Sequence, residues 1–153
     1  MYEFLWSAPI VTGTKPPHRL AHSTCVLQLP ASEGGAQAVV FGGAGYNFMF
    51  SDVHCLRLSH PTRANQFEWE QPETEGTPPS MRYGHNAQTI GRGNGARCMA
   101  VFGGVSAEGP VNDVHIMHLH GTTAQILIAR WSTPERPSGV GSWWPISRRS
   151  ART

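Results

Sequence analysis

Two patterns of residues occur twice in this chain, and this repetition constrains the fold more than any other feature. The first pattern of seven residues recurs 63 positions later as the same residue types. A second pattern of eight residues recurs at an offset of 61. The first copies are Trp6, Pro9, Gly13, Thr14, Pro16, Arg19 and His22, followed by Val40, Phe41, Gly42, Gly43, Asp52, Val53, His54 and Leu58. The chain is therefore a repeat protein, and Trp131 with Pro134 opens a further copy.

The length of the unit and the composition together indicate stacked small β-sheets. Repeats of about 50 residues are typical of propellers and stacked arrays. Charged residues make up only 14% of the 153 residues, whereas there are 17 glycines and 12 prolines, which suits short strands joined by tight turns. No run of 18 apolar residues occurs, so we expect no membrane span. A net charge of +2 is too weak to indicate nucleic-acid binding.

The N-terminus and the cysteines predict an intracellular, cytoplasmic protein. The segment from Met1 to Ile10 has no basic region before its apolar residues, unlike a secretory signal. The three cysteines are odd in number, lack the spacing of a metal site, and each lies within a predicted strand. We interpret Cys25, Cys55 and Cys98 as buried thiols in a reducing compartment.

Runs of apolar residues between turn residues predict four short strands in each unit. We expect Pro9 to Pro17 to be a loop, because Gly-Thr-x-Pro cannot pair in a central strand. Tyr2 to Trp6 is expected to be a short strand. Four consecutive short strands make an antiparallel meander of the size of one propeller blade. The predicted strands are His22–Leu29, Ala38–Phe41, Val53–Leu58 and Gln66–Glu70 in the first unit, and His85–Ile90, Cys98–Phe102, Val114–Leu119 and Gln125–Trp131 in the second.

These residues resemble the kelch repeat. Its hallmarks are an apolar strand that ends in Gly-Gly, an Asp-led strand, a later Trp, and an Arg-x-x-His before the next unit. His54 and His115 depart from the pattern, where an aromatic residue is commoner. The resemblance covers roughly Trp6 to Pro134 and implies an all-β fold of kelch-type β-propeller blades, with a scaffold or binding role, usually for a protein partner. The matching residues are Phe41-Gly42-Gly43, Asp52-Val53, Trp69 and Arg82-Tyr83-Gly84-His85, then Phe102-Gly103-Gly104, Asp113-Val114 and Trp131.

The signature residues have physical roles that agree with this resemblance. A large aromatic on the outer strand, Trp6, Trp69 or Trp131, can fill the wedge between blades. The glycine doublets allow a sharp exit from a strand. Asp52 and Asp113 can bond backbone amides in a turn. His22 and His85 recur in register, which favours a shared packing and hydrogen-bonding role over catalysis.

The chain divides into four parts on this interpretation. Residues 1–17 are the end of a preceding blade and a linker, 18–72 are the first kelch blade, 73–134 are the second, and 135–153 are an irregular tail. Periodicity fails in the tail, where Trp144 and Ser147 stand at the positions expected for Arg and His. Because a propeller has at least four blades, two give an incomplete ring. We therefore expect further kelch blades from a longer chain, or self-association, to close it.

Two sets of residues are candidates for binding a protein partner. In kelch propellers the position of Arg19 and Arg82 can face the central pocket and grip acidic groups. The alternative is that both arginines bond loop carbonyls and are structural. Tyr46, Asn47, Phe48, Met49 and Phe50 form an unusually apolar loop, which either tucks under the blade or makes a partner-binding patch.

The spacing of His115, His118 and His120 resembles a metal-binding cluster. On a strand, His118 and His120 share one face and His115 points the other way, so no third ligand is evident. We expect neither a metal nor a cofactor, and no catalytic residue.

The sequence thus predicts a non-catalytic protein–protein interaction module or scaffold. The alternative is a fragment of a kelch-propeller enzyme, or of a larger enzyme that carries a kelch domain. A copper oxidase of this type would need tyrosine and histidine ligands and a Tyr–Cys crosslink. Tyr2, Tyr46 and Tyr83 show no pairing with the cysteines that sequence can establish. A nonfunctional remnant is a third possibility.

Overall fold

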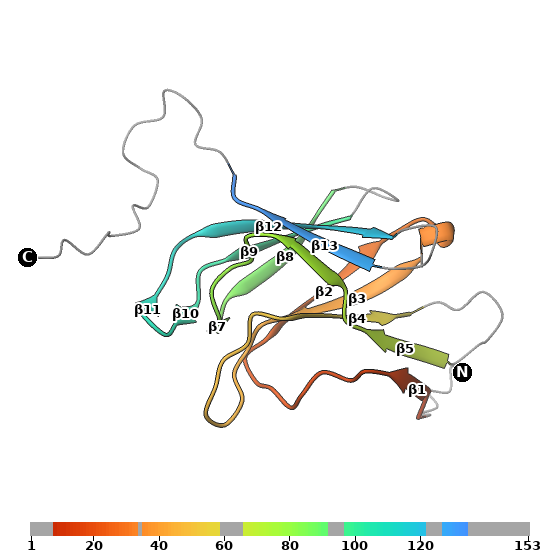
Figure 1. Ribbon diagram of the computed structural model, residues 1–153, viewed down its shortest axis with the longest axis horizontal. Coiled ribbons are helices and arrows are strands. Elements are labelled where there is room, and N and C mark those ends of the chain that lie inside the picture. Colours follow the sequence, from red (N-terminus) through yellow and green to blue (C-terminus); the bar gives the residue numbers. More distant parts are fainter. Residues whose placement is uncertain (1–7, 34, 59–65, 92–96, 122–126, 135–153) are drawn as a thin grey trace, which may run out of the picture.

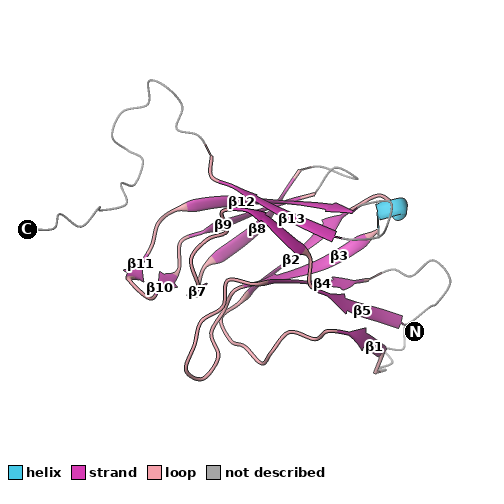
Figure 2. Cartoon of the chain, in the orientation of Figure 1, coloured by secondary structure: helices cyan, strands magenta, loops and turns pink. Residues whose placement is uncertain are grey.

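The fold consists of β-strands and loops. The computed structural model describes residues 8–33, 35–58, 66–91, 97–121 and 127–134. In these ranges the helical element is a single turn of 3-10 helix, η1 (Ala31–Glu33), as Figure 2 shows. No helix in the same ranges is long and apolar enough to cross a membrane. The prediction of a β-rich repeat fold is confirmed.

Two five-stranded sheets make up most of the structure, and Figure 1 shows the second lying above the first. The first sheet has the order β1-β5-β4-β3-β2 and the second the order β6-β13-β12-β9-β8. A small third sheet joins β7 (Arg82–Tyr83), β10 (Val105–Ser106) and β11 (Gly109–Pro110). The large sheets contain β1 (Ile10–Gly13), β2 (Ser23–Gln28), β3 (Ala36–Phe41), β4 (Val53–Arg57) and β5 (Gln66–Glu70), then β6 (Glu73–Gly76), β8 (Asn86–Ile90), β9 (Cys98–Phe102), β12 (Val114–Gly121) and β13 (Leu127–Ser132).

Four strands of each large sheet are the predicted antiparallel meander, and their bounds differ from the prediction by at most two residues. The fifth strand of each sheet was missed. Strands β1 and β6 run parallel to β5 and β13, so both sheets are mixed rather than purely antiparallel.

The prediction of a loop over Pro9 to Pro17 is therefore wrong for β1. A proline excludes a central strand position but not a strand at the edge, and β1 ends at Gly13 before Pro16 is reached. Gly13 has a φ of +80°, and a Cβ there would collide with the carbonyl of Trp69. The segment 1–17, assigned to a preceding blade, thus supplies an edge strand to the first sheet. The predicted strand from Tyr2 to Trp6 and the tail 135–153 lie outside the described residues.

The core is the layer between the two large sheets. The side chain of Phe41 lies at its centre, with ring centroids 5.2 Å from His85 and 5.0 Å from Trp131 of the second sheet. Alternate residues of β2, β3, β4, β9, β12 and β13 point into this layer, as the pleat of a strand predicts. The buried members are Cys25, Leu27, Leu29, Val39, Phe41, Val53 and Cys55 from the first sheet and its flanking loop, and Met99, Val101, Met117, Leu119, Leu127, Ala129 and Trp131 from the second.

Only one face of each sheet takes part in this layer. Phe102 occupies the repeat position of Phe41, yet its side chain is 52% exposed whereas that of Phe41 is 0% exposed. Likewise His22 is exposed, whereas its equivalent His85 is buried. The two units stack on one another, and the described residues form no closed ring.

Candidate functional site

The loops at one end of the two sheets gather several of the candidate residues. This end, which we call the loop end, contains the β3–β4 loop (residues 42–52), the β9–β12 loop (103–113), and the segments that enter β2 and β8 (18–22 and 80–85). In Figure 1 the β3–β4 loop, coloured gold, projects beyond the sheets near β7.

The side chain of Arg19 forms hydrogen bonds with both ends of the β3–β4 loop. Its guanidinium donates two hydrogen bonds to the carboxylate of Asp52, at 2.6 and 2.9 Å, and one to the carbonyl of Gly42 at 3.0 Å. The same group lies 4.0 Å from the ring centroid of Phe50, a cation–π contact. His54 Nε2 donates to the second oxygen of Asp52 at 2.9 Å. Arg19 therefore joins both ends of the loop to the segment before β2.

Arg82 repeats this arrangement in the second unit. It donates to Asp113 at 2.6 and 2.9 Å and to the carbonyl of Gly103 at 3.0 Å, and His115 donates to Asp113 at 2.9 Å. Its remaining contacts are the carbonyl and hydroxyl of Ser80. The side chain of Arg82 is 1% exposed.

These contacts correspond to the structural alternative for the two arginines. Each guanidinium is buried and donates hydrogen bonds to a loop carbonyl and to a carboxylate. A direct grip on acidic partner groups stays a prediction for Arg19 and Arg82.

The two aspartates remain ionised because of these partners. At Asp113 the hydrogen bonds from Arg82, and then from His115, lower the pKa to about 2 against the opposing effect of burial. At Asp52 burial is the largest influence and raises the pKa. Hydrogen bonds and charge from Arg19 and His54 outweigh it and hold the pKa well below its usual range. Both carboxylates thus act as permanent acceptors at neutral pH.

His85 joins the two sheets beside this network. Its Nε2 lies 2.8 Å from Ser23 Oγ in a hydrogen bond, and its ring meets Phe41 edge-on. Burial, and then the charge of Arg82, lower the pKa of His85 to about 4, so the ring is neutral. A Cβ on Gly42 would lie 2.9 Å from the ring of His85, so a glycine is needed where the sheets approach. His85 therefore packs and forms a hydrogen bond, whereas His22 is exposed, so the structure does not show the shared role predicted for the two histidines.

The tip of the β3–β4 loop projects into solvent. Tyr46 is 96% exposed and Phe48 is 57% exposed, and Asn47 between them is exposed as well. Met49 and Phe50 at the base are half-buried, and the ring of Phe50 packs edge-on against Phe48 at 5.0 Å. The base of the loop is thus packed and its apolar tip is exposed, so the loop combines features of the two predicted alternatives, a loop tucked under the blade and an exposed patch.

Further exposed apolar residues surround this tip and were missed from the sequence. Leu20, Met81 and Tyr83 are between 36% and 63% exposed. Backbone hydrogen bonds connect their segments to the loop and to each other, from the amides of residues 43, 82 and 84 to the carbonyls of residues 82, 50 and 21. The sequence did contain a signal for two of them, because Leu20 and Tyr83 are large apolar residues at the same repeat position, directly after Arg19 and Arg82. We call Leu20, Tyr46, Phe48, Met81 and Tyr83 the loop-end patch.

The histidines of β12 divide between two faces, as predicted. His115 is buried beside Asp113, whereas His118 and His120 stack on the opposite face with ring centroids 6.3 Å apart. His118 Nδ1 also lies 3.0 Å from Cys98 Sγ. Among the residues that the structure describes, no group of three His, Cys, Asp or Glu side chains could hold a metal ion.

The cysteines are free thiols in the described part of the chain. Burial raises the pKa of Cys25 and Cys55, and both are buried as predicted. Cys98 is only partly buried, so the prediction was wrong for this residue, because the face of β9 that carries it is the outer one.

Two stacked sheets that each contain a four-stranded meander, with Gly-Gly strand ends and Arg–Asp ion pairs in repeat positions, define a class, the β-rich repeat proteins. The model of the KLHDC2/KLHL20/DRC7 Kelch-repeats domain matches residues 1–147. The chain belongs to the kelch-repeat family.

The chain is similar to short segments of three longer relatives. It is 40% identical over 80 residues to a Rab9 effector protein with kelch motifs from Mus musculus, covering 52% of this chain and 19% of that protein. It is 33% identical over 123 residues to Kelch domain-containing protein 2 from Bos taurus, covering 69% and 28%. It is 28% identical over 136 residues to the Rho GTPase-activating protein gacHH of Dictyostelium discoideum, covering 87% and 7%. The chain spans less than a third of each.

Proposed function

We propose that this chain is a non-catalytic protein–protein interaction module that binds a protein partner through the loop-end patch. The observation that carries the proposal is the exposure of Tyr46 and Phe48 on a loop whose base is fixed. Isolated exposed apolar residues are normal, but several of them on hydrogen-bonded loops at one end of the sheets favour an interaction site.

The chemistry of the patch suits a protein partner. Tyr and Phe offer large contact areas, and their side chains lose little entropy when they become fixed because they are rigid, with about two rotatable bonds each, so aromatic residues dominate the energetics of many interfaces. The ion pair of Arg19 with Asp52 and the contact of Arg19 with Phe50 hold the loop base before binding. Such preorganisation lowers the entropic cost of association.

A double substitution at the loop tip tests the proposal. We expect Tyr46→Ala with Phe48→Ala to weaken the Kd for a partner isolated with the wild-type chain by at least about tenfold, roughly 1.4 kcal/mol. The melting temperature should change little, since both side chains are exposed. Ile10→Ala is the matched control, because Ile10 is 60% exposed on edge strand β1, outside the patch. Equal affinity of the double variant and the control would remove the patch from the model.

Substitution of Arg19 or Arg82 is a less specific test of partner binding. Both are buried in ion pairs, so Arg19→Ala or Arg82→Ala should lower the melting temperature as well as binding. A loss of binding in either variant would therefore not distinguish contact from support.

The second candidate is a fragment of a kelch-propeller enzyme, or of a larger enzyme that carries a kelch domain. The observation that favours it is the similarity to a Rho GTPase-activating protein, of which this chain would cover 7%. Metal analysis of the purified chain tests the oxidase form of this candidate, since stoichiometric copper or iron would support it. The sequence that flanks this segment tests the other form, because a catalytic domain there would make the chain the binding part of an enzyme.

A further inference from the structure

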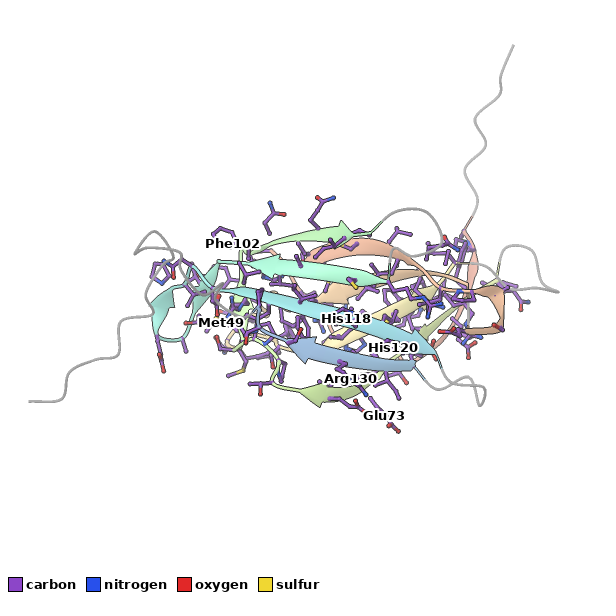
Figure 3. All side chains as sticks on the ribbon, turned by 90° about the horizontal axis from the view of Figure 1, so that it is seen from above. Met49, Glu73, Phe102, His118, His120 and Arg130 are labelled. Carbon is purple, nitrogen blue, oxygen red and sulfur yellow. The ribbon has the colours of Figure 1, made fainter. Side chains whose placement is uncertain are left out.

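The outer face of the second sheet occupies the repeat positions of the face that the first sheet buries, and it is likewise mostly apolar. Phe102, Ala100, Val114 and Ile116 stand 61 positions after Phe41, Val39, Val53 and Cys55. The four residues of the first sheet are almost wholly buried against the second sheet. None of the four in the second sheet is buried to that degree, and Figure 3 looks down on the sheet that carries them, with Phe102 near one end of β9.

The opposite end of the stack presents the complementary face. Among the residues that pack against the first sheet are Met117 and Trp131 of the second sheet and His85, which directly precedes β8. Their repeat equivalents in the first unit are His22, Leu56 and Trp69, of which His22 is exposed and the other two are half-buried. Val26, on the same face of β2 as Thr24, is 53% exposed.

We propose that a second copy of this chain seats the outer face of its first sheet on the outer face of the second sheet, repeating the contact that the chain makes within itself. This inference goes beyond the proposed function and does not depend on it. Since one chain carries both faces, each copy can offer one face to each of two neighbours.

The contact within the chain predicts the contacts between copies. Trp69 of the second copy would pack on Phe102, as Trp131 packs on Phe41 at 5.0 Å. His22 of the second copy would meet the edge of Phe102 and bond the amide of Asn86, as His85 meets Phe41 and bonds Ser23.

The backbone at Gly103 already has the conformation that the contact needs. Gly103 has a φ of +64°, close to the +61° of Gly42. A Cβ at Gly42 would meet His85 at 2.9 Å and the carbonyl of Arg82 at 3.0 Å, both from the second unit. A Cβ at Gly103 would approach only the carbonyl of Val111 within 4 Å. The space that His85 fills beside Gly42 is therefore free beside Gly103 to receive His22 of a second copy.

The polar end of the face is compatible with this contact. Cys98 occupies the position of Gln37, which is 0% exposed beneath the second sheet. Its thiol is already bonded to His118, so a covering sheet would bury a satisfied pair.

The association is head to tail, because two different faces meet. Such contacts form rings when the rotation between copies closes. The described residues of each copy form two large sheets, so two, three or four copies would bring together the four to eight blades of known propellers.

Two variants test this arrangement together with the wild-type chain. Phe102→Arg places a charge on one face and Val26→Arg places one on the other, at positions half-exposed in the single chain, so both variants should fold. Native mass spectrometry of the full wild-type chain should give a discrete oligomer of at least twice its mass of 16.7 kDa. Each variant alone should be monomeric, with a melting curve that remains cooperative.

Mixing the two variants is the decisive step. Each retains one intact face, and the intact faces are complementary, so an equimolar mixture should form a heterodimer and nothing larger. A wild-type chain that stays monomeric up to about 100 μM, roughly 5.5 kcal/mol of association free energy, would overturn the proposal. Variants that keep the wild-type oligomer, or a mixture that stays monomeric, would overturn it equally.

Discussion

The pair Phe41 and Phe102 allows one side chain to be compared in two environments within a single chain. Truncating a buried phenylalanine to alanine costs about 3–5 kcal/mol, from lost apolar contact and the cavity left behind. Phe41 is 0% exposed and touches His85 and Trp131, so Phe41→Ala should fall in this range. Phe102 is 52% exposed, so roughly half of the usual 1.5–3 kcal/mol of burial applies, and Phe102→Ala should cost about 1 kcal/mol.

Urea unfolding followed by tryptophan fluorescence measures both losses. With a slope of about 1.5 kcal/mol/M, Phe41→Ala should move the midpoint by about 2–3 M and Phe102→Ala by less than 1 M. Both variants should be made in the Val26→Arg background, which keeps the chain monomeric if copies associate. Trp131, one of five tryptophans, lies against Phe41 and contributes a signal from the core.

The difference between the two losses is the critical quantity. Equal losses within about 0.5 kcal/mol would refute the reasoning, because they would mean that Phe102 is covered as completely as Phe41. A small loss at both positions would show that the two sheets do not share the layer that contains Phe41.

Three further predictions concern His85, the ion pair of Arg82 with Asp113, and the glycines at the ends of β3 and β9. The pKa of His85 in the folded chain is about 4, against an ordinary value of 6.5, so the free energy of unfolding should fall by up to about 3 kcal/mol as the pH drops from about 6.5 to 4. Urea titrations at both pH values should show this loss, and His85→Gln should reduce the dependence of the unfolding free energy on pH. Asp113→Asn leaves the buried guanidinium of Arg82 without its counter-charge and should cost about 2–3 kcal/mol, less than for a fully buried pair because solvent reaches Asp113; a melting temperature equal to wild type would contradict this. Gly42→Ala and Gly103→Ala carry the same φ strain of about 1–2 kcal/mol, but only the first also collides with His85, so calorimetry should find it the more destabilising by about 1 kcal/mol or more, and the reverse order would contradict the close approach.

Much of the fold could be predicted because its causes are local. The apolar run before Gly42 and the Asp-led strand at Asp52 mark strand ends through backbone conformation and turn chemistry, which depend on neighbours in the chain. Strands β1 and β6 could not be predicted in the same way. Their pairing is parallel and joins residues 56 positions apart in the first sheet, Ile10 with Gln66, so no local pattern announces it.

The candidate site was predicted only where residues adjacent in the chain also lie together in space. The loop from Tyr46 to Phe50 could be recognised because its apolar residues are close together in the sequence. Met81 and Leu20 were not, since hydrogen bonds between segments more than 20 residues apart bring them to the patch. The choice between partner contact and support for Arg82 also needed the structure, because it depends on the distance to Asp113.

By itself the sequence determined the repeat, the strands and the identity of the residues at each repeat position. Only the tertiary structure decided which copy of a residue is buried. Phe41 and Phe102 have the same letter and the same place in the unit, yet one is enclosed and the other is half-exposed. The physical reason is that burial depends on the sheet that lies above, and the order of stacking places a sheet over Phe41 while leaving the face of Phe102 uncovered.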